Sequence, residues 1–94
     1  MLFAVTCFDK PDALPARLSA RPAHLEWIDA NKAQIRLAGP LLDPKGENPL
    51  GSLLVVEAGD LAAAESLLAG DPYRAAGVFA EVEVRPWRMT VNTL

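Results

Sequence analysis

Two short apolar segments constrain the fold of this chain more than any other feature of its sequence. The segments LFAVTCF (residues 2–8) and SLLVVEA (residues 52–58) are rich in β-forming residues and are followed by charged or turn-forming ones. Both carry mostly apolar side chains at odd and even positions alike, up to Glu57 in the second. Because strands that are apolar on both faces are typical of covered, central positions, we expect both segments to be central strands.

Two further segments have the features of edge strands. The segment QIRLAGPLLD (residues 34–43) contains Gly39-Pro40, and proline cannot donate a hydrogen bond to a strand ladder. The segment VFAEVEVRPW (residues 78–87) alternates in character, and a charged face protects an exposed sheet edge. We expect one of its faces to carry Phe79, Glu81, Glu83 and Arg85, and the other Ala80, Val82 and Val84.

The stretch from residue 12 to residue 34 is predicted to be helical, with an interruption. It contains Pro15 and Pro22, which lack a backbone donor and disfavour a helix interior. We therefore expect one or two helical turns near 12–20 and a separate helix from about residue 21, with Pro22 in its first turn.

A second helix is predicted over residues 60–70, after a loop at 44–52. Asp60 is a plausible N-cap and Gly70 a plausible C-cap of this helix. The segment DPYRAAG (residues 71–77) resembles one more helical turn. The buried stripe of the helix is expected to be Leu61, Ala64, Leu67 and Leu68.

The resulting order, β-α-β-β-α-β, predicts an α+β protein with a ferredoxin-like fold and a four-stranded antiparallel sheet. The strand order 4-1-3-2 of this fold places the two doubly apolar strands in the centre and the other two at the edges. A chain of this length is expected to form one domain, residues 1–94. Helices can cover one face of such a sheet, so the other face needs a partner, and a second copy of the chain is the simplest one.

Composition and charge argue against some classes of binding partner and indicate a cellular compartment. A net charge of -3, with scattered basic residues, argues against nucleic-acid binding. No apolar run approaches the roughly 20 residues of a membrane span, and the start of the chain lacks the basic region of a signal peptide. Cys7 is the single cysteine, which excludes an intrachain disulfide and fits a reducing cytoplasm. With one histidine and no carboxylates at ligand spacing, no metal site is expected.

Two residues are the first candidates for chemistry. His24 is the only histidine, and an imidazole changes charge near neutral pH. The alternative, which the sequence alone favours, is an ordinary residue beside the apolar stripe of a helix. Asp71 precedes Pro72 and has the pattern of a helix N-cap. The two roles of Asp71 are compatible, because one carboxylate oxygen could cap the turn while the other faces a histidine.

Three further side chains are candidates for holding a ligand. Arg21 lies one helical turn before His24 and could bind an anionic oxygen, Ser52 could donate a hydroxyl, and Tyr73 could line a pocket. Each has a purely structural alternative: a solvated charge, a turn-former and a packed aromatic residue. No phosphate-binding glycine loop and no G-x-S-x-G nucleophile motif is present.

Taken together, these segments resemble the YciI-like (YCII-related) family of small bacterial proteins. The resemblance rests on LFAVTCFDKPDA, RPAHLEWI, AGPLLD, GSLLVVEA and DPYRAAGVFAEVEVRPW, in that order along nearly the whole chain. It implies a ferredoxin-like fold that pairs into a dimeric α/β barrel. It also implies a candidate active site with a His-Asp dyad, which maps onto His24 and Asp71, and it implies no cofactor.

The resemblance leaves two functions open. The first is an enzyme that acts on a small anionic or phenolic molecule, with His24 as general acid or base in an elimination or isomerisation, since the broader superfamily contains lyases, isomerases and monooxygenases. The second is a non-catalytic module that binds a metabolite or a regulatory partner. Both predict a cytoplasmic homodimer with a small-molecule site.

Overall fold

The computed structural model describes residues 1–94 and contains a four-stranded antiparallel sheet in the order β2-β3-β1-β4. This order is the predicted ferredoxin-like one, with the two doubly apolar segments in the centre. The elements along the chain are β1 (Leu2–Asp9), α1 (Leu14–Ala30), β2 (Ile35–Leu42), β3 (Pro49–Glu57), α2 (Leu61–Ala69), α3 (Pro72–Ala75) and β4 (Phe79–Trp87).

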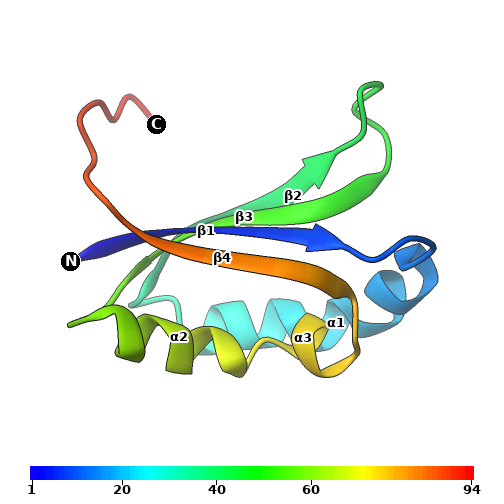
Figure 1. Cartoon of the computed structure of the whole chain (residues 1–94), viewed down its shortest axis with the longest axis horizontal. Coiled ribbons are helices and arrows are strands. Elements are labelled where there is room, and N and C mark those ends of the chain that lie inside the picture. The colour runs from blue at the N-terminus through cyan, green and yellow to red at the C-terminus, as the bar shows by residue number, and fades with distance from the viewer.

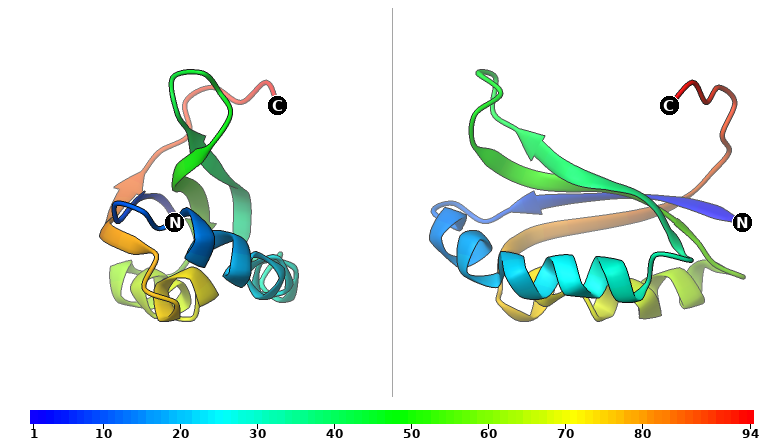
Figure 2. Two further views of the ribbon diagram at one scale, coloured as in Figure 1. Left: turned by 90° about the vertical axis from the view of Figure 1, so that its right-hand side faces the viewer. Right: turned by 180° about the vertical axis from the view of Figure 1, so that it is seen from behind.

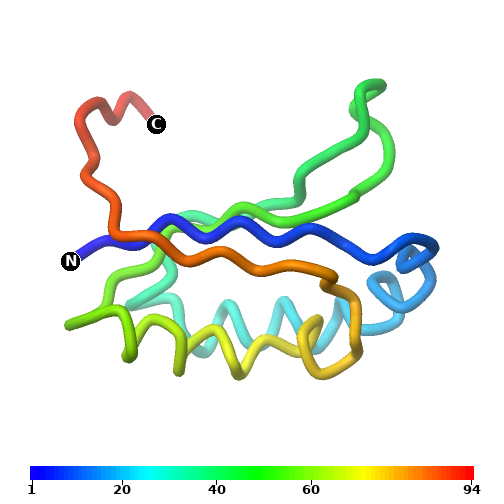
Figure 3. Tube along the Cα trace, viewed as in Figure 1, coloured from blue at the N-terminus to red at the C-terminus, as the bar shows by residue number.

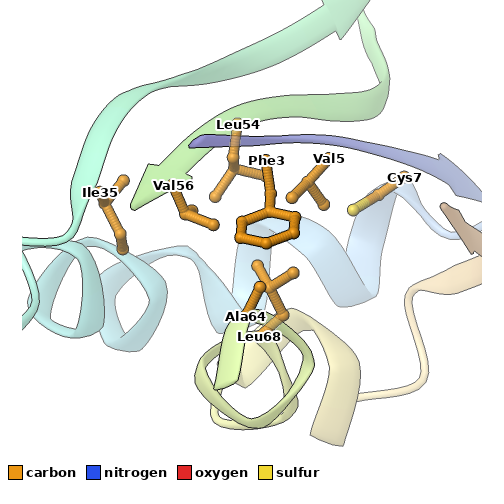
Figure 4. Close-up of a cluster of buried hydrophobic side chains, with 8 residues drawn as sticks. All are labelled: Phe3, Val5, Cys7, Ile35, Leu54, Val56, Ala64 and Leu68. Carbon is orange, nitrogen blue, oxygen red and sulfur yellow. The ribbon is translucent and has the colours of Figure 1, made fainter. Parts of the chain in front are cut away.

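All three helices lie on one face of the sheet, as Figures 1 and 2 show. The β2–β3 hairpin loop and the segment that follows Trp87 both rise on the opposite side (Figure 3). The main core is the layer between sheet and helices. It is drawn in Figure 4 and consists of Phe3, Val5, Cys7, Ile35, Leu54, Val56, Ala64 and Leu68. No helix is both long enough and apolar enough to cross a membrane.

The strand register decides which side chains face the helices. Val5 pairs with Leu54 on one side and with Val84 on the other, so alternate residues of three strands enter the same core. Strand β3 begins at Pro49, inside the stretch predicted to be a loop, because Leu42 pairs with Pro49 at the end of the hairpin.

The prediction that Phe79 shares a face with Glu81 was wrong. Phe79 packs against the buried core, whereas Glu81 is exposed. The reason is a register shift between Phe8 and Asp9, where β1 pairs with β4. An irregularity of this kind reverses the alternation of side chains on the strand that carries it.

The prediction of two separate helices before β2 was also wrong, because α1 is continuous from Leu14 to Ala30. Pro15 occupies the first turn, where no intrahelical donor is needed. Pro22 lies in the helix interior, on an exposed part of the surface. The carbonyl that loses its donor there belongs to Leu18, which is exposed, so water can satisfy it.

The caps of the second helix are confirmed. Asp60 accepts a hydrogen bond from the backbone N–H of Ala63 at 2.8 Å, and Gly70 is the C-cap. Ala64 and Leu68 are buried as expected, whereas Leu61, the first residue of the predicted stripe, is exposed. One further turn, α3, follows directly, with the buried Asp71 as its N-cap.

Candidate active site

His24 and Asp71 meet although 47 positions separate them in the sequence. The Nδ1 atom of His24 lies 2.8 Å from Oδ1 of Asp71, and the two residues are only 8% and 2% exposed. An ionised carboxylate only accepts, so Nδ1 is the donor in this contact. The neutral imidazole then carries its lone pair on Nε2, which forms no hydrogen bond within the chain.

Asp71 uses one oxygen for two partners. Its Oδ1 atom accepts from the backbone N–H of Tyr73 at 3.0 Å, which caps α3, and the same atom contacts His24. The two roles of Asp71 are compatible, as expected, but one oxygen serves both and not one oxygen each. The capped turn and the histidine contact both depend on the placement of this atom.

Aromatic rings hold the imidazole from two directions. Tyr73 stacks on His24 with ring centroids 3.9 Å apart and planes at 15°, and Trp27 lies at 5.9 Å. Gly70, next to Asp71, permits this arrangement because a Cβ there would lie 3.2 Å from Nε1 of Trp27. The orientation of His24 is thus restrained by its ring contacts as well as by its hydrogen bond.

Arg17 is a site residue that the sequence analysis did not identify. It is 3% exposed, donates from Nε and Nη2 to the two oxygens of Asp9 at 2.8 and 2.9 Å, and lies 4.5 Å over the ring of Tyr73. Burial alone would lower the pKa of the guanidinium, but the hydrogen bonds and charge of Asp9 raise it overall. The only available signal was its position, seven residues before His24 and therefore on the same side of the helix.

Ser52 and Arg21 occupy different environments at this site. Ser52 is 3% exposed, and its Oγ accepts from Nη2 of Arg17 at 2.9 Å. The preceding Gly51 is required for this placement, since any Cβ there would overlap the backbone oxygen of Cys7. Arg21 is exposed and forms no ion pair.

A cavity of about 460 Å³ between α1, the start of β3, the β2–β3 hairpin and α3 brings these residues together. Apolar side chains from the helix and from the strands form much of its wall. Its polar lining comprises His24, Tyr73, Ser52, Arg17, Arg21 and Glu47. All three predicted ligand-binding residues therefore face the same space as His24, while Asp71 supports the site from outside the lining.

The groups beneath the site are strongly desolvated. Burial, together with the nearby charge of Asp71, raises the pKa of the Cys7 thiol to about 12. Burial also raises the pKa of Tyr73, against the opposing effect of Arg17 and Arg21. No group of three or more histidine, cysteine, aspartate or glutamate residues is arranged to hold a metal ion.

The fold and the site define a ferredoxin-like α+β protein with a histidine–carboxylate contact at the wall of a small-molecule-sized cavity. The chain belongs to the YCII-related family, whose domain matches residues 1–88. It is 37% identical over 95 residues to the protein YciI of Escherichia coli O6:H1 (strain CFT073), covering 94% of this chain and 97% of that protein. An uncharacterized protein of Haemophilus influenzae is 36% identical over the same shares of both chains.

Solved structures extend the comparison. The 5-chloro-2-hydroxyhydroquinone dehydrochlorinase TftG from Burkholderia phenoliruptrix AC1100, solved with 2,5-dihydroxybenzoquinone, superposes with a TM-score of 0.88 at 33% identity and covers 94% of both chains. An antibiotic biosynthesis monooxygenase described from Bacteroides thetaiotaomicron has a TM-score of 0.60 at 12% identity, over 100% of this chain and 92% of that one. The second likeness shows the fold alone.

Proposed function

We propose that this protein is a cofactor-independent enzyme in which His24 transfers a proton during elimination or isomerisation of a small hydroxylated ring. One observation carries the proposal: Asp71 holds Nδ1 of a buried imidazole at 2.8 Å, and Nε2 is left without a partner at a cavity wall. A neutral imidazole held in this way is suited to general base catalysis. The dehydrochlorination named for TftG is a reaction of this class.

The proposed elimination needs no oxidant and no co-reactant. Nε2 of His24 takes the proton of a C–H or O–H bond, and the electron pair of that bond forms a new π bond. The halide leaves carbon with the electron pair of its own bond, and water later removes the proton from the imidazolium. Asp71 would stabilise the imidazolium while it exists, because its carboxylate accepts the Nδ1 hydrogen bond.

Arg21, Ser52 and Tyr73 are proposed to hold the substrate against His24. Arg21 is an unpaired cation at the cavity, Ser52 offers a hydroxyl, and Tyr73 contributes to the wall. We also propose a homodimer, because one face of the sheet is apolar and uncovered by this chain. The buried free thiol of Cys7 is compatible with the reducing cytoplasm that we propose as its location.

Two readouts test the proposed activity. Halogenated hydroxyhydroquinones should release chloride, and related hydroxylated rings should exchange hydrogen with deuterated water in the presence of the protein. His24→Ala should lower both rates about 10²–10⁴-fold, the usual contribution of a general acid–base group. Glu26→Gln, which neutralises an exposed carboxylate on the same helix, should leave both rates unchanged.

The same assay distinguishes a binding module from an enzyme. If the rings bind but neither chloride release nor deuterium exchange exceeds the uncatalysed rate, the protein binds its ligand without turning it over. Equal rates for the parent protein and His24→Ala would also contradict the proposed role of the histidine.

A further inference from the structure

Three hydrogen-bond donors at the cavity have no acceptor within the chain. Ser52 Oγ accepts from Nη2 of Arg17, so its own hydrogen remains free. The hydroxyl of Tyr73 lies beside the guanidinium of Arg17, from which it can only accept, so the phenol hydrogen is free as well. Nη1 of Arg17 contacts neither Asp9 nor Ser52. No side-chain nitrogen or oxygen that is sealed from solvent lacks a partner. Nη1 and the phenol oxygen are therefore accessible to solvent. Both residues are almost fully buried and line the cavity, so these atoms are exposed to the cavity.

The guanidinium of Arg17 is held rigidly in this position. Two hydrogen bonds to Asp9 fix the plane of the guanidinium, and a third joins it to Ser52 Oγ. The centre of the Tyr73 ring lies 4.5 Å from the central carbon of the guanidinium. Donors that are oriented before the ligand arrives stabilise negative charge without reorganisation. Arg17 is therefore placed to act on a ligand through the one nitrogen that its protein partners leave free.

The lining of the cavity carries two cations, Arg17 and Arg21, and one carboxylate. Asp9 offsets the charge of Arg17, while Arg21 adds a cation with no carboxylate partner. The one acidic residue of the lining, Glu47, is exposed on the β2–β3 loop. An ionised oxygen at the three free donors would meet their hydrogen bonds and the adjacent cations Arg17 and Arg21.

The donors and His24 lie at different points along the cavity. Arg17 and His24 are seven residues apart on α1, which corresponds to about 10.5 Å along a helix axis. The ring of Tyr73 contacts both of them. A ligand that contacts both would place its charge toward Arg17 and its labile hydrogen toward His24.

From these contacts, we propose that Arg17 Nη1, Ser52 and Tyr73 form an anion-binding hole for one ionised oxygen of the substrate. The substrate is then a ring that binds as a phenolate or enolate anion, with the reacting hydrogen facing His24. This inference rests on the proposed function for the position of the reacting hydrogen, whereas the hole itself can be tested without turnover.

The test is calorimetric binding of 2,5-dihydroxybenzoquinone, which is ionised at neutral pH, and of its uncharged dimethyl ether. The parent protein should prefer the ionised ring. Ser52→Ala should weaken binding of the ionised ring about 10–100-fold, the effect of losing a hydrogen bond to a charged group, and should leave the ether unaffected. Ser52→Thr restores the hydroxyl and should restore binding, and Ser19→Ala, at an exposed serine on α1, should bind like the parent.

The outcomes test the anion-binding hole independently of the acid–base role of His24. Equal affinity of the parent and Ser52→Ala for the ionised ring, with both folded by near-ultraviolet circular dichroism, overturns the anion hole, as does failure of the parent to bind that ring. Neither result changes the expectation that His24→Ala loses turnover. Conversely, a His24→Ala protein that keeps full activity while Ser52→Ala loses binding overturns the acid–base proposal and supports the hole.

Discussion

At the scale of the residue, the site depends on one carboxylate oxygen that serves both a helix cap and a histidine. Oδ1 of Asp71 accepts from Tyr73 N–H at 3.0 Å and from His24 Nδ1 at 2.8 Å. The stacked Tyr73 ring follows Asp71 by two residues, so the cap also positions the ring that packs on the imidazole. A substitution that changes this atom is therefore expected to change the tautomer and orientation of His24 without unfolding the protein.

Asp71→Asn should no longer restrict His24 to a single tautomer. It should keep α3 capped, because asparagine is as good an N-cap as aspartate. In the parent, nitrogen NMR of the neutral imidazole should show the hydrogen on Nδ1. In the variant a substantial Nε2–H population should appear, since an amide can donate to Nδ1 as well as accept from it. Asp60→Asn, at the other aspartate N-cap, is the matched control and should show the parent spectrum. Identical spectra for all three proteins would contradict the proposed orienting role of Asp71.

Cys7 should be inert to alkylation in the native protein. Burial raises its pKa from 9.0 to about 12, so the thiolate fraction at pH 8 falls about 1,000-fold, and the thiolate is the reactive form. Iodoacetamide labelling followed by mass spectrometry should be slow until pH approaches 12, and rapid in denaturant. Fast labelling of the folded protein at pH 8 would contradict the closed packing beneath the site.

The same shift has a consequence for stability. Below about pH 9 the thiol is protonated in both states, and the contribution of Cys7 to folding is fully present. Between about pH 9 and 12 the unfolded thiol ionises and the native one does not, so the free energy of unfolding should decrease as pH rises. Denaturant titrations should show a weaker decrease in Cys7→Ala, with the contribution of Tyr73 common to both proteins.

At the scale of the element, α1 supplies three of the six polar residues that line the cavity. Arg17, Arg21 and His24 recur at four- and three-residue spacings, which places them on one side of a continuous helix. A break at Pro22 would have separated His24 from Arg17 and Arg21 in space. The helix continues through the proline, and buried contacts on both sides of it, Asp9 with Arg17 and Asp71 with His24, accompany that continuity.

Pro22→Ala should stabilise the protein, whereas Pro15→Ala should not. An interior proline removes a helix hydrogen bond and costs about 3 kcal/mol, partly offset by about 0.4–1 kcal/mol from its restriction of the unfolded chain. We expect a gain of about 2 kcal/mol for Pro22→Ala, measured by urea denaturation. Pro15 is in the first turn, where its missing donor is not needed, so its replacement is the control. Equal effects of the two substitutions would contradict this explanation.

At the scale of the whole molecule, the sheet has one face covered by helices and one left open (Figure 2). The open face carries apolar side chains from three of the four strands, β1, β2 and β3. Among them, Leu37 is 41% exposed and Leu53 is 44% exposed. Charged residues lie at the margins of this face, where Glu81 and Glu83 on β4 alternate with core residues and Glu57 at the end of β3 pairs with Arg36 on β2. A contiguous apolar face of this kind is typical of an interaction surface, and we expect a second copy of the chain to cover it.

Leu53→Glu should weaken the expected dimer about 10–100-fold, because it removes a leucine worth about 1.5–3 kcal/mol on burial and adds a charge. Sedimentation equilibrium of the parent and the variant measures the change. Leu61→Glu alters a leucine of similar exposure, 42%, on α2 at the opposite face, and should leave association unchanged. A monomeric parent, or equal association of all three proteins, would contradict pairing through the open face.

The elements and their order were predictable because their signals are local. Apolar residues on both faces marked β1 and β3 as central strands, and Asp60 with Gly70 marked the ends of α2. The prediction for α1 was wrong because the energetic cost of a proline can be seen in the local sequence. The contacts that accompany the intact helix are made with residues far away in the sequence and cannot be seen there. The same limit applies to Phe79, whose direction depends on a register shift against another strand.

The sequence by itself determined the ferredoxin-like order of elements and the chemical types available at the site. Periodicity, caps and turn residues act over a few positions, so they can be seen without the fold. Only the tertiary structure decided that Arg17 is buried against Asp9, that Ser52 retains a free hydroxyl hydrogen, and that a single oxygen of Asp71 serves both Tyr73 and His24. These facts depend on distances of about 3 Å between residues far apart in the chain, and hydrogen-bond energy is sensitive to distances on that scale.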